Sequence, residues 1–268
     1  MALIILENGD LASGGNDKVI KIWNMEDGTV KRTFTGHTCS IRDFKLVLNS
    51  LISASDDSTI KIWSIDQGTV LRTLTGHNGS VYALEIIKNG DLASASADKT
   101  IKIWNINDGT LKKTLIGHTN AVWTLVFLDS GELVSGSGDN TIKIWDVDKG
   151  LVKRTLEAHT GGLYRLVLLR NGDLASSSHD KTIKIWNLKD GNVKRILTGH
   201  TDLVFTLKEL DNGDLVSGSN DKTIRVWDVE KGIMKKDISV NYEIWSFETL
   251  KSGELVSGCS KGTIKIWD

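Results

Sequence analysis

Short apolar stretches alternate with polar turns along the whole chain. Within residues 117–155, the apolar stretches are "AVWTLVFL", "ELVSGSG", "TIKIWDV" and "LVKRTL", and the breaks fall at Ser130-Gly131, Asp139-Asn140 and Lys149-Gly150. Stretches of this length that are rich in Ile, Val, Thr and Trp are typical of β-strands, and Gly, Asp and Asn at the breaks are typical of tight turns. No stretch of useful length has helical periodicity. The unit is therefore predicted to be a four-stranded antiparallel meander.

The same unit recurs from one end of the chain to the other. Its third strand ends in a tryptophan in every copy, at Trp23, Trp63, Trp104, Trp145, Trp186, Trp227 and Trp267. Successive tryptophans are 40 or 41 residues apart, and a fixed period of this kind determines the architecture. Because one such sheet cannot bury both of its faces, the copies must pack face to face around an axis. We therefore predict an all-β fold, a seven-bladed β-propeller of four-stranded antiparallel blades that spans residues 1–268 as a single domain.

A linear solenoid is the alternative arrangement of such repeats. Its two ends would need polar capping repeats, and neither end of this chain is atypical in that way. The closed ring is therefore favoured.

Three polar residue types keep fixed distances from the seven tryptophans. A serine lies ten residues before each of them, and an aspartate lies six residues before the first six, with Lys261 in the seventh copy. A histidine lies 26 or 27 residues before five of them, and Val240 takes its place in the last copy. The five complete sets are His37, Ser53, Asp57 and Trp63; His77, Ser94, Asp98 and Trp104; His118, Ser135, Asp139 and Trp145; His159, Ser176, Asp180 and Trp186; and His200, Ser217, Asp221 and Trp227.

These motifs identify a family resemblance. The chain has Gly-His before most first strands, S-x-S-x-D-x-T-I-K-I-W across the second and third strands, and Trp-Asp or Trp-Asn at the end of most copies. In these features it resembles the WD-repeat family of β-propellers over its full length. The resemblance implies that each set forms a buried chain of hydrogen bonds, from the Asp carboxylate to the His ring, from His to the Ser hydroxyl, and from Ser to the Trp indole N–H.

His, Ser and Asp together also suggest a hydrolase triad. Catalysis needs one pre-organised site, however, whereas this set occurs five times at nearly the same spacing. The structural role is therefore favoured, and we expect no enzymatic activity. Glycine-rich stretches such as "SGGND" are turns rather than phosphate loops, so no cofactor is expected, and no metal-binding spacing is present.

Composition excludes other classes of function. The net charge is −1, from 33 basic and 34 acidic residues, so the whole chain has no field that would attract nucleic acid or a membrane surface. The basic residues of the third and fourth strands recur from copy to copy and are therefore spread around the circumference. Two cysteines, Cys39 and Cys259, lie in different repeats, and the first residues do not form a signal peptide. We expect an intracellular protein, cytoplasmic or nuclear.

Function is expected where the copies differ. Five residues after each histidine, or after Val240, stand Arg42, Tyr82, Trp123, Tyr164, Phe205 and Trp245. By the resemblance, this position lies at the mouth of the central channel, where related adaptors bind peptides, some of them by enclosing an arginine between rings. The residue before the structural aspartate also varies and reaches the same face, with Asp56 and His179 as its chargeable members. Packing of the rings between blades is the alternative.

The sequence thus predicts a non-catalytic scaffold or substrate-recognition module. Its partners would be proteins or peptides, some of which insert an Arg or Lys against the ring faces. The alternative is a regulatory or sensor propeller within a larger multidomain enzyme.

The last copy lacks a fourth strand. The first six copies continue after their tryptophan with "TVKRTF", "TVLRTL", "TLKKTL", "LVKRTL", "NVKRIL" and "IMKKDI", whereas the seventh stops at Asp268. Aligning "MALIILENGDLAS" with "YALEIIKNGDLAS" places Met1 inside the innermost strand of the first blade. We expect 27 strands, a domain that is part of a longer chain, and a monomer whose exposed edge, Thr263–Asp268, is available for strand addition.

Overall fold

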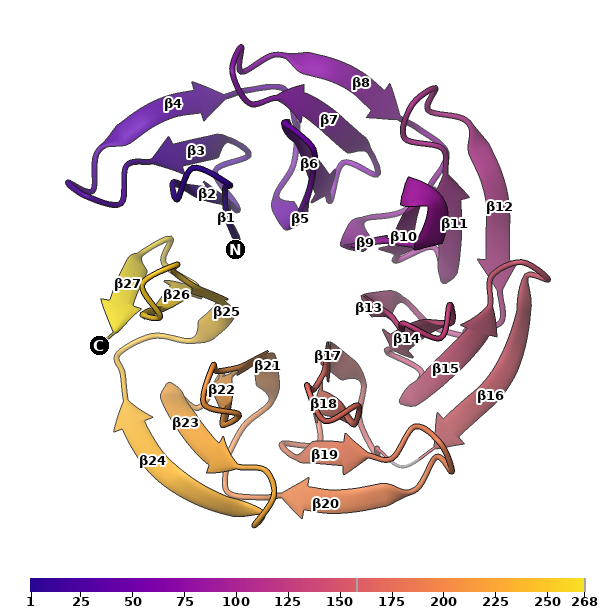
Figure 1. Cartoon of the computed structure of the whole chain (residues 1–268), viewed down its shortest axis with the longest axis vertical. Helices are drawn as coiled ribbons and strands as arrows, with labels where there is room; N and C mark the ends of the chain where they lie inside the picture. Colours follow the sequence, from indigo (N-terminus) through magenta and orange to yellow (C-terminus); the bar gives the residue numbers. More distant parts are fainter. Residues whose placement is uncertain (158, 268) are drawn as a thin grey trace.

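The computed structural model describes residues 1–157 and 159–267, which form seven antiparallel sheets arranged around a central axis (Figure 1). The first four blades are β1–β4 (Ala2–Ile5, Leu11–Gly14, Ile20–Trp23 and Val30–Phe34), β5–β8 (Ile41–Val47, Ser50–Ser55, Ile60–Ser64 and Val70–Leu74), β9–β12 (Val81–Ile86, Leu92–Ser96, Thr100–Trp104 and Leu111–Ile116) and β13–β16 (Val122–Phe127, Leu133–Ser137, Thr141–Asp146 and Leu151–Glu157). The last three blades are β17–β20 (Leu163–Leu168, Leu174–Ser178, Ile183–Trp186 and Val193–Leu197), β21–β24 (Val204–Glu209, Leu215–Ser219, Thr223–Asp228 and Ile233–Ser239) and β25–β27 (Ile244–Thr249, Leu255–Cys259 and Ile264–Trp267). A short 3-10 helix, η1 (Lys88–Gly90), lies between β9 and β10.

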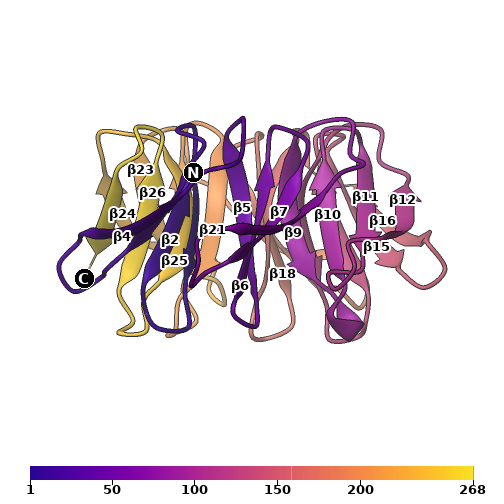
Figure 2. The same cartoon turned by 90° about the horizontal axis from the view of Figure 1, so that it is seen from above.

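The inner strands of each blade run roughly along the axis, whereas the outer strands curve around the circumference, and many turns gather at the two faces of a disk (Figure 1 and Figure 2). The first strand of each blade lines the channel, and the last lies at the circumference (Figure 1). The predicted seven-bladed propeller is therefore confirmed, with six four-stranded blades and a three-stranded seventh blade. No helix in the part of the chain that the structure describes is long and apolar enough to cross a membrane.

Burial follows the position of a strand in its blade. The second strand is fully buried, as in β10, β14, β18 and β22, because it is covered on both faces by neighbouring blades. Its side chains are accordingly small, as in "LASAS" and "LVSGS". The third strand alternates buried and half-buried residues, and the outermost strand is mostly exposed.

The core lies between the blades. Each interface between consecutive blades is filled by one cluster, in which a tryptophan of one blade packs against the fourth strand of the preceding blade. Leu115 of β12 joins Trp145 of β15 in this way, and Phe34 of β4 stacks on Trp63 of β7 with ring centroids 5.8 Å apart. The fourth strand therefore completes its own sheet and also covers the next tryptophan.

The seam is the junction between the first blade, β1–β4, and the seventh, β25–β27. It closes the ring by packing β1 against β25 (Figure 1). No strand among the described residues pairs with the outer edge of β27. Consequently Ile266 is 41% exposed, whereas its equivalent Ile144 is 5% exposed. The expected edge, Thr263–Asp268, is thus open over β27, and Asp268 lies outside the described residues.

Hydrogen exchange tests this topology. The amides of Ile264–Trp267 that point away from β26 have no strand partner among residues 1–157 and 159–267, whereas Thr141–Asp146 of β15 is paired on both sides. We expect these β27 amides to exchange at least about tenfold faster than those of Ile142–Trp145, because local opening is easier at an unpaired edge. Native-state exchange of the dilute protein, followed by NMR, measures this. Equal protection in both strands would show that another part of the chain covers the edge.

Candidate functional site

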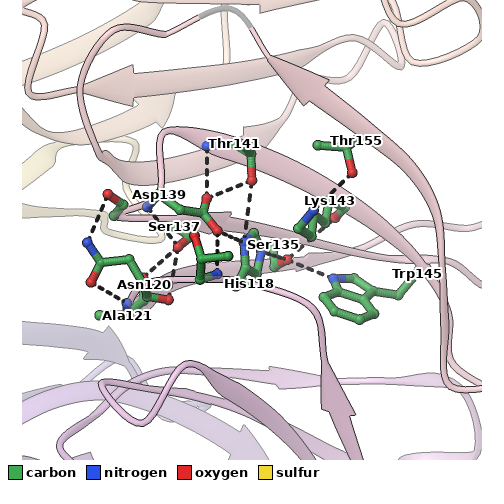
Figure 3. A network of polar contacts seen from close by, with 12 residues as sticks. His118, Asn120, Ala121, Ser135, Ser137, Asp139, Thr141, Lys143, Trp145 and Thr155 are labelled. Atoms are coloured by element: carbon green, nitrogen blue, oxygen red, sulfur yellow. Dashed lines mark hydrogen bonds and ion pairs between the residues drawn. The ribbon is translucent and has the colours of Figure 1, made fainter.

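A chain of hydrogen bonds ties each complete blade together, and Figure 3 shows it in the fourth blade. The carboxylate of Asp139 accepts from His118 Nδ1–H at 2.7 Å, and the hydroxyl of Ser135 donates to His118 Nε2 at 2.7 Å. Ser135 Oγ in turn accepts from the indole Nε1–H of Trp145 at 2.7 Å. The carboxylate also accepts from the backbone N–H of Thr119 and Thr141 and from the Thr141 hydroxyl. The chain therefore links the loop before the first strand to the second and third strands.

The same geometry is present in all five blades that have a histidine. The His Nδ1 to Asp distance is 2.7–2.8 Å, the His Nε2 to Ser distance is 2.7 Å, and the Trp to Ser distance is 2.7–2.8 Å. All five serines are fully buried. A hydroxyl that no substrate can reach cannot act as a nucleophile, so these sets act as structural networks.

The network shifts the acidity of its members. Burial acts to raise the pKa of Asp139, but hydrogen bonds from His118 and Thr141 outweigh it and hold that pKa well below its ordinary value. The pKa values of Asp57, Asp98, Asp180 and Asp221 are lowered for the same reasons. Burial lowers the pKa of His37 and of His200, because it disfavours the imidazolium more than the neighbouring aspartate favours it. In the networks of His37 and His200, an ionised carboxylate bonded to a neutral imidazole is therefore the favoured state.

The two blades at the seam keep only part of the network. Trp23 donates to Ser13 at 2.7 Å and Trp267 donates to Ser257 at 2.8 Å, but neither blade has the histidine. In the first blade the carboxylate of Asp17 accepts instead from Lys21 at 2.8 Å.

A G-x-S-x-G sequence, residues 258–262, spans the end of β26 and the turn that leads to β27. In hydrolases this motif forms a strand-to-helix elbow, but here a strand follows. The hydroxyl of Ser260 donates to the carboxylate of Glu243. The motif is therefore a turn and not a nucleophile elbow.

The variable residues that stand five positions after each histidine, or after Val240, line one cavity at the end of the channel. A cavity of about 340 Å³ is lined by Met1, Arg42, Tyr82, Trp123, Tyr164, Phe205 and Trp245. This set, here called the mouth, contains all six residues of the predicted column, and each of them is half-buried. A half-buried ring has one part packed on the protein and another part available to a partner.

The rings of the mouth form a continuous arc. Trp123 and Tyr164 are stacked, with centroids 4.7 Å apart and planes at 15°. Tyr164 then meets Phe205 edge-on at 5.1 Å, and Phe205 meets Trp245 edge-on at 5.9 Å. A guanidinium held between two parallel rings would need a separation of about 7 Å, twice the van der Waals contact distance. The spacing of Trp123 and Tyr164 is too small for this, so a cation would lie on the inner faces of the arc.

Chargeable residues lie beside the mouth at two places. Arg42 forms a bidentate ion pair with Asp56, with Nε to oxygen distances of 2.9 Å and an Nη2 to Oδ2 distance of 2.5 Å. The hydrogen bonds to Asp56 raise the pKa of Arg42. His179 is exposed and lies edge-on to Tyr164, with centroids 6.4 Å apart. Asp56 and His179, the two chargeable residues that directly precede a structural aspartate, therefore lie beside the mouth, although neither lines the cavity.

Sequence reasoning did not include three residues of the mouth region. Met1 occupies the place of Tyr82 in the first blade, which the alignment of the two strands could have shown. Burial, followed by the charge of Arg42, lowers the pKa of the Met1 amine to about 5. Gly138 and Gly162 give room to the Trp123 ring, since an added Cβ would lie 3.2 Å and 2.6 Å from it, and no pattern in the sequence indicated this.

The comparisons with known proteins agree with the architecture. The WD40 family model, described as WD domain, G-beta repeat, matches residues 28–64, 68–105, 109–146, 150–187, 191–228 and 239–268. The crystal structure of the WD40 beta propeller domain of Doa1 is similar, with 29% sequence identity and a TM-score of 0.88 over 100% of this chain and 91% of that one. None of the curated proteins compared matches the chain.

Removing the carboxylate tests the network. Asp139→Ala should lower the free energy of unfolding by about 1–3 kcal/mol, because it removes the carboxylate that accepts from the buried Nδ1–H of His118. His118→Ala should then cost less in that background than alone, since the two residues belong to one network. Urea unfolding of the four proteins measures both effects, and strict additivity would contradict the network. The matched control is Asp17→Ala, where no histidine faces the carboxylate and we expect a loss below about 0.5 kcal/mol.

The lowered pKa values predict how stability depends on pH. As the pH falls through about 6.5, the unfolded chain takes up protons at His37 and His200 that the folded protein does not, so the free energy of unfolding decreases. The Met1 amine contributes to the same decrease. Below about pH 4 the aspartates protonate in the unfolded chain while the five network carboxylates stay ionised in the folded one, so a second decrease follows. Urea midpoints measured from pH 8 to pH 3 test this, and a constant midpoint from pH 7 to pH 5 would contradict the assignment of neutral histidines.

Proposed function

Because the chain belongs to the WD40 repeat family, we propose that it is a non-catalytic scaffold or substrate-recognition module that binds a peptide or a protein segment at the mouth. WD40 propellers are typically protein-interaction scaffolds and are generally non-catalytic. The site and the chemistry of its partner are the specific parts of this proposal.

The arc of half-buried rings carries the proposal. Side chains at repeated positions hold the blades together, so a ring used only for packing would be expected at every equivalent position. Instead the column holds Arg42, Met1 and five aromatic residues of different size around a cavity of about 340 Å³. Large aromatic side chains around a concave surface are typical of binding hot spots, since they supply contact area at little cost in conformational entropy.

The electrostatics of the arc favour a basic side chain. The faces of Trp123, Tyr164 and Trp245 attract Lys or Arg through their quadrupoles. The charge of Arg42 is neutralised by Asp56 in a bidentate pair, so it does not repel an incoming cation strongly. We therefore infer a partner segment that places a Lys or Arg against the inner faces of the rings.

The proposed setting is the cytoplasm or the nucleus. Cys39 is exposed and Cys259 is buried, and both are free thiols. Free thiols fit a reducing compartment.

Removing one aromatic side chain of the mouth tests the proposal. Peptides that bind the purified protein are first selected from a displayed random library, and their affinities are measured by calorimetry. Trp123→Ala should weaken the binding of the selected peptides by about 2 kcal/mol or more, because it removes the ring of a hot-spot residue. The stability of this variant, measured by its midpoint of thermal unfolding, should change much less than its affinity for the peptides. Replacing the Arg or Lys of the peptide by Ala should weaken binding to the wild type and have little further effect on Trp123→Ala.

Two further variants make this test specific. Gly162→Ala keeps the ring but places a Cβ 2.6 Å from it, so Trp123 must move and binding should weaken. Ile116→Ala removes an apolar side chain that is 75% exposed on β12, away from the mouth, and should leave binding unchanged. Unchanged peptide affinity in Trp123→Ala, together with a large loss of stability, would mean that the ring is core and that the site is wrongly assigned.

A further inference from the structure

The channel beyond the mouth is lined by the free edges of the first strands, because each of these strands pairs with its own blade on one side only (Figure 1). In two places a side chain of the preceding blade satisfies a backbone N–H on such an edge. The carboxylate of Asp43 on β5 accepts from the N–H of Leu84 on β9 at 2.8 Å. The hydroxyl of Thr124 on β13 accepts from the N–H of Leu166 on β17 at 3.1 Å. The position of Asp43 and Thr124 is therefore the place of an acceptor.

A donor stands at this position in the fifth blade. Arg165 on β17 lies 41 residues after Thr124 and has the same place in its blade. By the same register, the N–H that points toward it belongs to Leu207 on β21, 41 residues after Leu166. A guanidinium has five N–H donors and no acceptor, so Arg165 cannot accept from Leu207. Two donors thus lie together where the second and fourth blades supply a donor and an acceptor.

The guanidinium of Arg165 is free to bind a ligand. Its side chain is exposed and has no hydrogen bond or ion pair within residues 1–157 and 159–267. The lysines of the first strands are occupied, since Lys45 donates to Glu85 at 2.8 Å and Lys208 donates to Glu248 at 2.6 Å. Burial raises the pKa of Glu85, and the charges of Lys45 and Arg165 oppose this rise. Because Glu85 lies two blades away from Arg165, the guanidinium must extend into the channel.

The two donors lie next to the mouth. Arg165 directly follows Tyr164, and Leu207 is two residues after Phe205, so both belong to strands whose rings form the arc. The pairing of β17 passes from Leu163 to Arg165, which makes Tyr164 the extra residue of a β-bulge. A bulge redirects the side chains around it. A segment that enters the channel past these two rings therefore meets the donors next.

The donors fit a carboxylate. Its two oxygens can accept from the guanidinium and from the backbone N–H together, and charge-assisted hydrogen bonds of this kind are strong. Asp43 shows that the channel accommodates a carboxylate at the equivalent place. A phosphate group would carry a second negative charge, which the carboxylates of Glu85 and Glu248 on the first strands oppose.

We propose that Arg165 and the backbone N–H of Leu207 form a carboxylate-binding site in the channel, directly beyond the rings of Tyr164 and Phe205. This inference rests on the proposed function and adds a second requirement for the partner. The partner segment carries a carboxylate close to the Lys or Arg that contacts the arc, either on an Asp or Glu side chain or at its C-terminus. This carboxylate takes between the fifth and sixth blades the place that Asp43 has between the second and third.

Sodium acetate is the first probe, because it presents a carboxylate without the rest of a partner. Increasing acetate should shift the backbone amide signal of Leu207 in ¹H–¹⁵N spectra of the intact protein. Arg165→Gln should reduce this shift at least about fivefold, because it removes the charged donor. Sodium chloride at the same concentrations controls for ionic strength. No acetate-specific shift of Leu207, or an equal shift in Arg165→Gln, would overturn the proposal.

The library-selected peptides are the second probe. Those that depend on Trp123 should contain Asp or Glu at a fixed distance from their Lys or Arg, or should need a free C-terminus. Replacing the acidic residue by its amide, or amidating the C-terminus, should weaken binding to the wild type at least about tenfold and to Arg165→Gln less than about twofold. The change that has this effect identifies the source of the carboxylate.

A charge reversal gives the converse result. Arg165→Glu should weaken the binding of the acidic peptides at least about tenfold, and peptides with Lys in place of the acidic residue should prefer this variant to the wild type. Arg170→Gln is the matched control, because Arg170 lies on the same blade in the turn between β17 and β18 and bonds to Asp211. It should not change the affinity of any peptide.

The channel site and the mouth can fail separately. Peptides that need Trp123 but bind Arg165→Gln as tightly as the wild type overturn the channel site and support the mouth. Peptides that lose affinity with their carboxylate in the wild type only, yet do not need Trp123, support the channel site and contradict the mouth. The exposed Arg165 should not affect stability, and an unchanged unfolding midpoint of Arg165→Gln excludes a folding defect as the cause of weaker binding.

Discussion

The hydrogen bond from the tryptophan indole to the serine hydroxyl is the one link of the polar network that all seven blades keep. It joins Trp23 to Ser13 and Trp267 to Ser257 even though both of these blades lack the histidine. The bond fixes the indole against the buried second strand, and from the second blade to the seventh the other side of the ring packs on the fourth strand of the preceding blade. Each of these six tryptophans thus orients its own sheet and also joins it to the preceding one. The ring of blades depends on this double use of one side chain.

This constraint explains why the repeated residues have a structural role. A buried indole N–H needs an acceptor, the serine that accepts it needs its own acceptor, and the histidine that serves there must be held in one tautomer. The aspartate completes the series, and its remaining lone pairs are used by backbone N–H groups. Every member is thereby committed to a structural bond, and the His, Ser and Trp side chains of the five complete sets are buried. Positions outside this series are free to differ between blades, and the residues of the mouth are among them.

The sequence predicted the features that depend on spacing within one copy. The blade count, the five networks and the open seventh blade all follow from distances along the chain, which the period of 40 or 41 residues makes unambiguous. Features that depend on neighbouring blades were not predictable in the same way. The stacking of Trp123 on Tyr164 depends on the angle between two blades and on the space left by Gly162. The ion pairs between the fourth strand and the turn after the first strand, such as that of Lys153 with Glu132, were also missed, although the second blade has Leu71 and Ser50 at these two positions. The loss of both partners together could have indicated this contact.

The mouth and the seam are linked through shared walls. Met1 and Trp245 line the mouth and also a second cavity of about 330 Å³ at the seam, and the indole N–H of Trp245 is buried without an acceptor among the described residues. The half of the mouth formed by Trp123 and Tyr164 lies on blades far from the seam and is braced by Gly138 and Gly162. The packing of the seam should therefore affect partners that contact Trp245 more than partners held by the stacked pair.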